Sequence, residues 1–499
     1  MGKTQTTIKN SSLEAYFEGF RKNIIGINQT FTTPYGEKKI LYADWIASGR
    51  LYRPIEEKLL SDFGPFVANT HTETTITGTT MTRAYAEARS IIKEHVNASQ
   101  EDVLITTGSG MTGVINKFQR ILGLKLPENL KPHTEIPDEK RPVVFLTHME
   151  HHSNQTTWLE TIAHVVVVPP DEDGLICLDT FEKYIREHEA APIKIAAVTA
   201  ASNVTGICTP YHEIARLIHR YNGLCFVDFA CSAPYVNMDM HPEDHEAHLD
   251  AIYFSPHKFL GGPGSSGVLL FHNDLYHNKV PDNPGGGTVS WTNPWGNHKY
   301  IDDIETREDG GTPAFLQTIR VALAIRLKEE MGVENILERE HELIKRVFDR
   351  LSERTGINIL APRHKDRLGC FSFYIDELHF NLAVKLLNDQ YGIQTRGGCS
   401  CAGTYGHYLL HVDEEMSRSI TCEIDEGDLS HKPGWIRMSI HPTNTMAEID
   451  FICEAILEIA ENHKEWAKDY RYDPKSNEFI HRSNGKDELN QMRSFFTIS

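Results

Sequence analysis

The sequence lacks several features that would place a protein in a specialised class. It has no uninterrupted apolar run long enough to cross a bilayer, so we expect no membrane partner. Its first ten residues are polar and have no apolar core of the kind found in secretory signals. Without such a signal, the nine cysteines are expected to be reduced thiols rather than a disulfide framework. These absences predict a cytoplasmic protein.

Basic residues are scarce as well. The 50 lysines and arginines are outnumbered by 69 aspartates and glutamates, which gives a net charge of −19. Binding to nucleic acid requires a basic footprint that displaces counterions, so we expect no nucleic-acid partner. Internal repeats and low-complexity tracts are also missing, and 40% apolar with 24% charged residues is typical of a globular protein.

The middle of the chain alternates short, β-branched apolar runs with amphipathic runs such as Tyr211–Tyr221, where Ile214, Leu217 and Ile218 share a helical face. This alternation predicts right-handed βαβ units and a mostly parallel sheet with helices on both faces. The candidate strands are Asp102–Thr107, Pro142–Thr147, His164–Val168, Lys194–Thr199, Leu224–Asp228, Asp250–Ser255 and Ser266–Phe271.

After about Thr312 the pattern changes to long helices, Pro313–Met331 and Val333–Arg354, followed by a strand–helix–strand region and a last helix at Met446–His463. We therefore expect an α/β fold with a large domain built on a mostly parallel seven-stranded sheet, plus a smaller α+β domain. The expected divisions are an N-terminal segment that packs with the small domain at 1–40, the large domain at 41–325, the small domain at 326–465 and a polar C-terminal tail at 466–499.

A glycine-rich loop follows the first predicted strand. Gly108-Ser109-Gly110-Met111-Thr112-Gly113 matches G-x-G-x-x-G, but a dinucleotide site also needs a second strand with an acidic end about 20 residues on. That stretch, 126–141, is instead a loop with prolines and lysines. The loop still suits a phosphate, because its glycines allow close approach and a helix N-terminus offers free N–H groups. A simple strand-to-helix turn explains this motif equally well.

Three further residues follow predicted strands. His151, in Glu150-His151-His152-Ser153-Asn154, offers an imidazole that can stack on a flat ring, although it is also an ordinary loop residue. Asn203 can donate to a phenolate-like oxygen or simply stabilise a turn before Gly206. Asp228 ends an apolar strand, where a carboxylate needs a cation such as a protonated pyridine nitrogen, although capping or metal binding is an alternative.

The fourth feature is Lys258, in Ser255-Pro256-His257-Lys258, between a predicted strand and the glycine-rich stretch 261–264. Burial in a partly dry site lowers the pKa of a lysine and makes it an imine-forming amine. Ser255 and His257 are candidate phosphate ligands. A single lysine is usually an exposed loop residue, but the order of these features along the chain favours a site for pyridoxal 5'-phosphate (PLP).

At this point the sequence resembles the class V aminotransferase family of fold-type I PLP enzymes, and within it the cysteine desulfurase and selenocysteine lyase branch. The resemblance extends from about Tyr42-Ala43-Asp44 to the last predicted helix. Besides the histidine and lysine motifs, the matching segments are Asn69-Thr70-His71, Gly310-Gly311-Thr312-Pro313 and Ile436-Arg437-Met438-Ser439.

The resemblance implies a role for each matching residue. Lys258 is expected to hold the cofactor as a Schiff base and to move protons, His151 to stack on the ring and Asp228 to pair with its nitrogen. Asn203 is expected to orient the ring oxygen and to contact the substrate, whose α-carboxylate Arg437 and Arg396 would bind. The remaining expected cofactor contacts are Ser109, Gly110, Met111, Thr112, Cys231, Ser255, His257 and, from the partner subunit of a homodimer, Thr312.

The loop Gly397–Gly403 carries two thiols. In enzymes that this chain resembles, a cysteine here takes the substrate's sulfur as a persulfide, and Cys401 is the better match, with Cys399 as a second candidate. Arg396 and a cationic site would lower the pKa of such a thiol. The alternatives are two inert thiols or a Cys-x-Cys metal pair, which lacks two further ligands of suitable spacing, so we expect no metal.

The expected function is a PLP-dependent, cysteine desulfurase-like C–S lyase that acts on L-cysteine or a related amino acid and passes sulfur to an acceptor protein. Two departures from the family leave other reactions open: Cys231 replaces a common glutamine, and the stretch before Arg437 is long and acidic at 423–428. The alternatives are another PLP reaction (β-elimination, epimerisation or transamination) and a non-catalytic scaffold, against which the presence of both Lys258 and Arg437 speaks.

Overall fold

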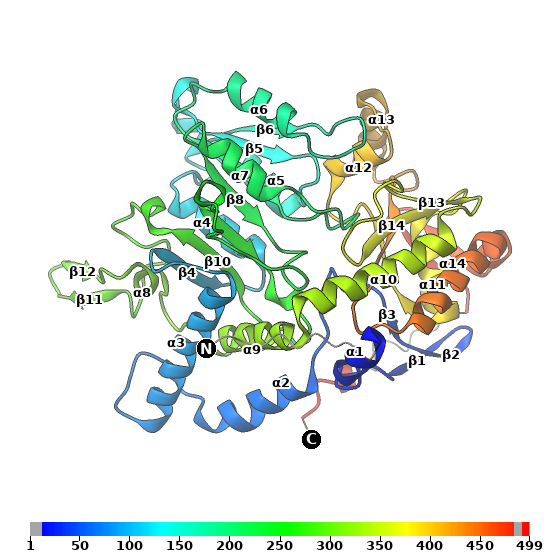
Figure 1. The fold of residues 1–499 in the computed structure, drawn as a ribbon, viewed down its shortest axis with the longest axis horizontal. Coiled ribbons are helices and arrows are strands. Elements are labelled where there is room, and N and C mark those ends of the chain that lie inside the picture. The colour runs from blue at the N-terminus through cyan, green and yellow to red at the C-terminus, as the bar shows by residue number, and fades with distance from the viewer. Residues whose placement is uncertain (1–11, 484–491, 499) are drawn as a thin grey trace.

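The computed structural model describes residues 12–483 and 492–498, and its larger lobe is built on one seven-stranded sheet (Figure 1). The strand order is β4-β10-β9-β8-β7-β5-β6. The strands are β4 (Asp102–Thr107), β5 (Val143–Thr147), β6 (His164–Val168), β7 (Lys194–Thr199), β8 (Leu224–Asp228), β9 (Ala251–Phe254) and β10 (Gly267–His272).

Six of these strands point the same way. Strands β5 to β9 pair in parallel, and β10 is antiparallel to both β4 and β9, so β4 shares the direction of the parallel set. This confirms the expected α/β fold with a mostly parallel sheet. Because the carboxyl ends of parallel strands meet at one edge, the segments that follow β4, β5, β7, β8 and β9 all start at the same edge of the sheet.

Helices cover both faces of the sheet, since alternate strand residues point to opposite sides. Val143 and Phe145 of β5 belong to one buried cluster, and Val144 and Leu146 belong to the other. The first cluster includes side chains of α3 (Ile76–His95), α6 (Leu178–Glu187), α7 (Tyr211–His219) and α9 (Phe315–Met331), and the second those of α4 (Met111–Ile121) and α5 (His152–Leu159).

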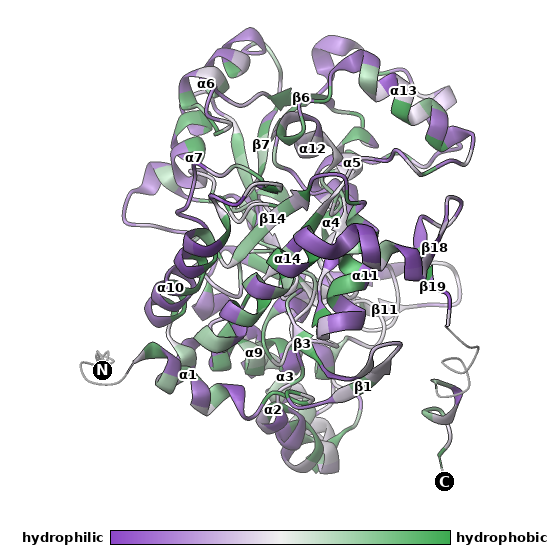
Figure 2. Cartoon of the chain, turned by 90° about the vertical axis from the view of Figure 1, so that its right-hand side faces the viewer, coloured by the Kyte–Doolittle hydropathy of each residue, from purple (hydrophilic) through white to green (hydrophobic). Residues whose placement is uncertain are grey.

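The smaller lobe has its own antiparallel sheet, with the order β13-β14-β17-β16 and a separate buried core. Hydrophilic residues dominate the outer faces of its helices α10 and α14 (Figure 2). Its elements are β13 (Ile357–Ile359), β14 (Cys370–Ile375), β16 (Arg396–Gly398), β17 (Trp435–Ser439), α10 (Val333–Leu351), α11 (Phe380–Tyr391), α12 (Gly403–Leu409), α13 (Glu414–Asp425) and α14 (Met446–Trp466).

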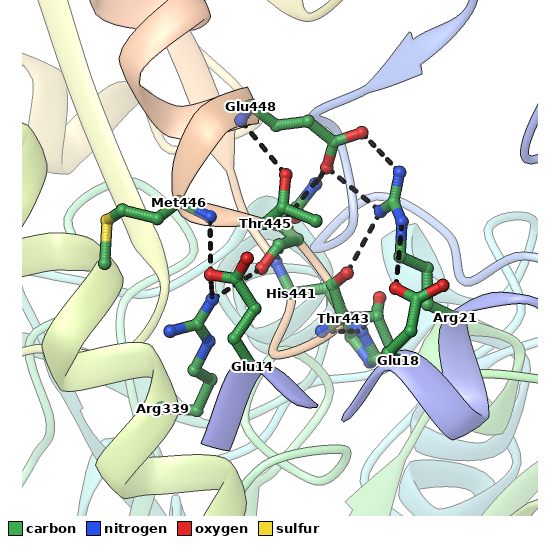
Figure 3. Close-up of polar contacts among 10 residues, drawn as sticks. Glu14, Glu18, Arg21, Arg339, His441, Thr443, Thr445, Met446 and Glu448 are labelled. Atoms are coloured by element: carbon green, nitrogen blue, oxygen red, sulfur yellow. Dashed lines mark hydrogen bonds and ion pairs between the residues drawn. The ribbon is translucent and has the colours of Figure 1, made fainter. Parts of the chain in front are cut away.

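The N-terminal segment is anchored to this lobe by charged contacts (Figure 3). The Arg21 guanidinium donates to Glu448 (2.9 Å) and to the Thr443 carbonyl (3.0 Å), and Arg339 pairs with Glu14 (2.7 Å). Its elements are α1 (Leu13–Arg21), β1 (Thr30–Thr33), β2 (Gly36–Lys39) and β3 (Leu41–Tyr42), and β3 pairs in parallel with β15 (Ile393–Gln394). Residues 1–11 of the expected N-terminal segment lie outside the described residues.

The expected polar tail contains regular structure. The last helix continues to Trp466, and the hairpin β18 (Tyr470–Asp473) and β19 (Glu478–His481) follows it. Across the residues that the structure describes, the helices are too short or too polar to span a membrane. The remaining α-helices and strands are α2 (Arg53–Lys58), α8 (Ile304–Glu308), β11 (Val289–Thr292) and β12 (His298–Tyr300).

Candidate active site

A cavity of about 590 Å³ lies at the carboxyl edge of the large sheet and is lined on its other side by residues of the small lobe. It brings together residues that are far apart in the sequence. The expected site residues that line it are Gly110, Met111, Thr112, His151, Asn203, Asp228, Cys231, Ser255, His257, Lys258, Arg396, Cys399, Cys401 and Arg437.

Two expected residues are not part of its lining. Ser109 is exposed beside Gly108, whose left-handed φ of +62° favours glycine. Thr312 is also exposed, and the backbone N–H of its neighbour Gly311 donates to the Gly286 carbonyl (2.9 Å). Thr312 therefore does not line the cavity of its own chain, and its role in the site of a partner subunit stays a prediction.

Lys258 and Asp228 both line the cavity and interact electrostatically. Burial lowers the pKa of Lys258, an effect that Cys231 and Asp228 oppose and that Arg437 and Arg396 reinforce. Burial also raises the pKa of Asp228 to about 6, against the effects of the Ala230 N–H (2.7 Å) and of Lys258. A carboxylate and an amine that are both desolvated in this way are each available to a ligand in the cavity.

His151 is held as a neutral imidazole. It caps α5, because its Nδ1 accepts from the Ser153 N–H at 3.0 Å, and burial followed by the charge of Lys258 lowers its pKa to about 3. The buried Glu150 beside it accepts from Thr147 Oγ1 (2.6 Å) and from Asn154 Nδ2 (2.7 Å). These bonds fix the start of α5 and therefore the direction of the imidazole.

The end of the cavity that suits a phosphate is the N-terminus of α4. Its first N–H, from Met111, donates to Ser255 Oγ at 2.8 Å, and Thr112 Oγ1 lies 2.7 Å from Ser153 Oγ. Gly110 packs closely here, since an added Cβ would lie 3.3 Å from Ser255 Oγ. An open helix N-terminus with hydroxyl groups is a favourable environment for a phosphate.

The opposite wall carries two arginines that share one carboxylate. Arg396 and Arg437 are direct cross-strand partners on β16 and β17, where like charges repel. Asp44 lies between them, at 3.1 Å from Arg396 Nε and 2.7 Å from a terminal nitrogen of Arg437. In the sequence, Asp44 is notable only as the start of the resemblance, because its two arginine partners are hundreds of residues away.

Buried polar atoms of residues in this wall lack partners among the described residues. Two of them are the side-chain oxygen Oδ1 of Asn203 and the Arg437 Nε, while Asn203 Nδ2 donates to the Ser400 carbonyl at 2.7 Å. An unsatisfied buried group costs about 1–3 kcal/mol. Both atoms belong to residues that line the cavity, so a ligand with polar groups fits this wall.

Replacing Asp44 with asparagine is expected to raise roughly tenfold the KM for the amino-acid substrate that the sequence predicts, because one charge-assisted pair is lost and the two arginines repel each other. The kcat should change less than the KM. Steady-state kinetics test this, with Asp349→Asn, which alters an exposed pair with Lys345, as the control. An unchanged KM would show that Asp44 does not position Arg437.

The cysteine loop is tied to α5. Cys401 is exposed, and its carbonyl accepts from the His152 N–H at 2.7 Å, while His152 Nε2 accepts from the Gly403 N–H at 3.0 Å. The third thiol of the cavity, Cys231, is different: burial raises its pKa, and it donates to the Ala201 carbonyl at 2.8 Å. Cys231 is therefore a protonated wall residue.

Part of the wall comes from segments that sequence reasoning did not place there. Leu429 and Lys432 follow α13, and Ser476 and Asn477 form the turn of the β18–β19 hairpin. The Leu429 N–H donates to the Pro474 carbonyl (3.2 Å), and Asn381 Nδ2 donates to the Asn477 carbonyl (2.6 Å). Alternating residues around a Pro-Lys-Ser-Asn cluster are a hairpin signal, but no local signal indicates where such a hairpin docks.

The architecture, with a mostly parallel sheet and the cavity at its carboxyl edge, is that of the fold-type I enzymes. Solved structures agree. An apo cysteine desulfurase from Thermococcus onnurineus gives a TM-score of 0.71 at 23% identity over 89% of this chain and 98% of that one. The cysteine desulfurase CsdA from Escherichia coli gives 0.69 at 22% identity over 91% and 99%.

Sequence comparison is more specific. Residues 41–452 match the aminotransferase class-V family. A probable cysteine desulfurase from Halalkalibacterium halodurans is 31% identical over 73% of this chain and 84% of its own length, and one from Staphylococcus aureus is 28% identical over the same shares. The chain belongs to the class-V aminotransferase family and is thus an enzyme of a PLP-dependent class.

Proposed function

We propose that this enzyme is a cysteine desulfurase-like C–S lyase that takes the sulfur of L-cysteine, or of a related amino acid, onto Cys401. The observation that carries the proposal is the exposed Cys401 thiol in the same cavity as the half-buried Lys258 and the buried Arg437. An amine, a carboxylate-binding guanidinium and a nucleophilic thiol in one cavity are the groups that such a reaction requires. The names of the relatives support the same reaction.

The cavity also fits PLP. We assign Asp228 to the ring nitrogen, His151 to the ring face and Asn203 to the ring oxygen. Asn203 is buried and lines the cavity. When bound, PLP draws electrons away from the Cα of an attached amino acid. The proposed phosphate ligands are Gly110, Met111, Thr112, Ser255 and His257, with Ser109 beside them and Thr312 of the partner subunit of a homodimer.

The remaining roles belong to the chain's own groups. Lys258, whose pKa burial lowers, releases its proton readily and serves as the base near the substrate's Cα. Arg437, supported by Arg396, orients the substrate carboxylate, and Asp228 keeps a proton at the ring nitrogen. Cys401 accepts the sulfur as a persulfide, the rest of the substrate leaves as alanine, and an acceptor protein takes the sulfur. All nine cysteines are free, which supports a reducing location such as the cytoplasm.

Replacing Cys401 with serine is expected to reduce alanine formation from L-cysteine at least about a hundredfold, because the hydroxyl is a far weaker nucleophile. The visible spectrum of the PLP-loaded protein should not change. Cys422→Ser is the matched control, since Cys422 is also exposed but lies on α13 and does not line the cavity. Undiminished alanine would refute attack by Cys401, and pyruvate in its place would indicate β-elimination.

A further inference from the structure

The cavity contains a second thiol that the proposed reaction does not use. Cys399 lines it beside Cys401, whereas the third thiol, Cys231, donates to a backbone carbonyl and has a raised pKa. Cys399 is half-buried and packs against the apolar cluster that contains Tyr405 and Trp435. Cys399 is therefore less exposed than Cys401 and lies two residues from the thiol that is proposed to carry sulfur.

The backbone between the two thiols forms a tight turn. The Ala402 N–H donates to the Cys399 carbonyl at 3.0 Å, and Ser400 and Cys401 both have left-handed φ angles, +52° and +57°. Together these define a primed β-turn. In so compact a turn, alternate Cα atoms lie about 5.5 Å apart, within the range that a disulfide bridges.

This turn is held although its conformation is unfavourable. Each non-glycine residue in the left-handed region costs about 1 kcal/mol or more. Contacts from the large lobe compensate: Asn203 Nδ2 donates to the Ser400 carbonyl and the His152 N–H donates to the Cys401 carbonyl, both at 2.7 Å. Asn203 lines the cavity and His152 adjoins the cavity residue His151, so the site itself keeps the two cysteines in one turn.

We propose that Cys399 is a resolving thiol. Once Cys401 carries the substrate's sulfur, the Cys399 sulfur attacks Cys401 Sγ, the bond from Cys401 to the outer sulfur breaks, and that sulfur leaves with the bonding electrons as hydrosulfide. The Cys399 proton goes to the departing sulfide or to water, and a Cys399–Cys401 disulfide remains. The outer sulfur is reduced and the two cysteines share the oxidation. This inference rests on the proposed function.

The next turnover then requires an external thiol or dithiol reductant, which reduces the disulfide. Hydrosulfide is a good leaving group because its conjugate acid has a low pKa. A disulfide across a single residue closes a small ring, and strained disulfides are the more easily reduced ones. The enzyme would thus release free sulfide in addition to supplying sulfur to an acceptor that reaches Cys401 first.

A single turnover without reductant tests the proposal. The PLP-loaded wild type is mixed with one equivalent of L-cysteine, quenched in acid, alkylated and digested with trypsin, which gives the peptide Gly397–Arg418 with no cysteines besides this pair. We expect an unalkylated disulfide in this peptide and about one sulfide per alanine. Cys399→Ser should keep an alkylated persulfide on Cys401, with the sulfide-to-alanine ratio lowered at least about tenfold. The control Cys177→Ser, outside the cavity, should keep the wild-type ratio.

Other outcomes overturn the proposal in distinguishable ways. Alanine with a stable persulfide on Cys401 and an alkylated Cys399 in the wild type would refute the resolving role alone. A persulfide on Cys399 would reverse the two roles and refute it as well. If no alanine forms, the proposed function fails and this inference fails with it. The wild-type peptide decides among these cases even if the Cys399 variant does not fold.

Discussion

Alanine formation from L-cysteine is expected to fall at least about a thousandfold when Lys258 is replaced with alanine. The Nζ atom of Lys258 has no hydrogen-bond or ion-pair partner among the described residues, and burial lowers its pKa. An amine that is desolvated without a structural partner is poorly explained by stability and well explained by chemistry. The variant should also lose the visible absorbance of a cofactor bound through this amine.

Lys328 offers a matched comparison. Lys328 is buried, and burial lowers its pKa to about 7, but its ammonium donates to the Ala233 carbonyl at 2.7 Å and the residue does not line the cavity. Lys328→Met is expected to lower the free energy of unfolding by about 2 kcal/mol while the activity of the folded fraction stays within about twofold. Steady-state kinetics and urea unfolding measure the activity and the free energy of unfolding of both variants. Comparable losses of activity in the two would contradict the assignment of Lys258.

The contrast between these two lysines illustrates what the sequence can predict. Lys258 was predictable because a short apolar run before it indicates a strand, and the carboxyl end of a parallel strand lies at the ligand-binding edge. Asp228 follows from the same reasoning one strand away. The prediction needs only local pattern and a general property of parallel sheets. Neither prediction requires knowing which distant segment of the chain packs against the residue.

The rest of the site depends on contacts that no local pattern specifies. Asp44 lies beside Arg437 because β3 is fixed against the small lobe, and Arg396 faces Arg437 only through the register of β16 and β17. Asn477 reaches the cavity through its carbonyl bond to Asn381. Such positions are set by long-range packing, so polar residues in an expected tail and loop gave no sign of their place in the site.

Asp228 allows a prediction in which stability and activity change in opposite directions. Its pKa of about 6 in the cofactor-free protein exceeds its ordinary value of 3.8, so the folded protein binds the proton more tightly than the unfolded chain does. Stability should therefore fall as the pH rises from about 4 to about 6 and remain lower above that, by roughly 3 kcal/mol. Asp228→Asn removes this pH dependence. We expect the cofactor-free variant to gain about 2 kcal/mol at pH 8 and to lose at least about a hundredfold in activity.

The control variant, Asp250→Asn, is expected to change stability in the opposite direction. Burial would raise the pKa of Asp250, at the other end of the same part of the sheet, but hydrogen bonds from His219, His248 and the Cys225 N–H lower it to about 2. Asp250 thus stabilises the fold above pH 4, and Asp250→Asn should destabilise it at pH 8 with little change in kcat. Urea unfolding at pH 4 and pH 8 measures both variants. A loss of stability in Asp228→Asn at pH 8 would indicate that its carboxylate is already paired within the chain, whereas a gain in stability with a loss of activity identifies a buried charge kept for a cationic ligand.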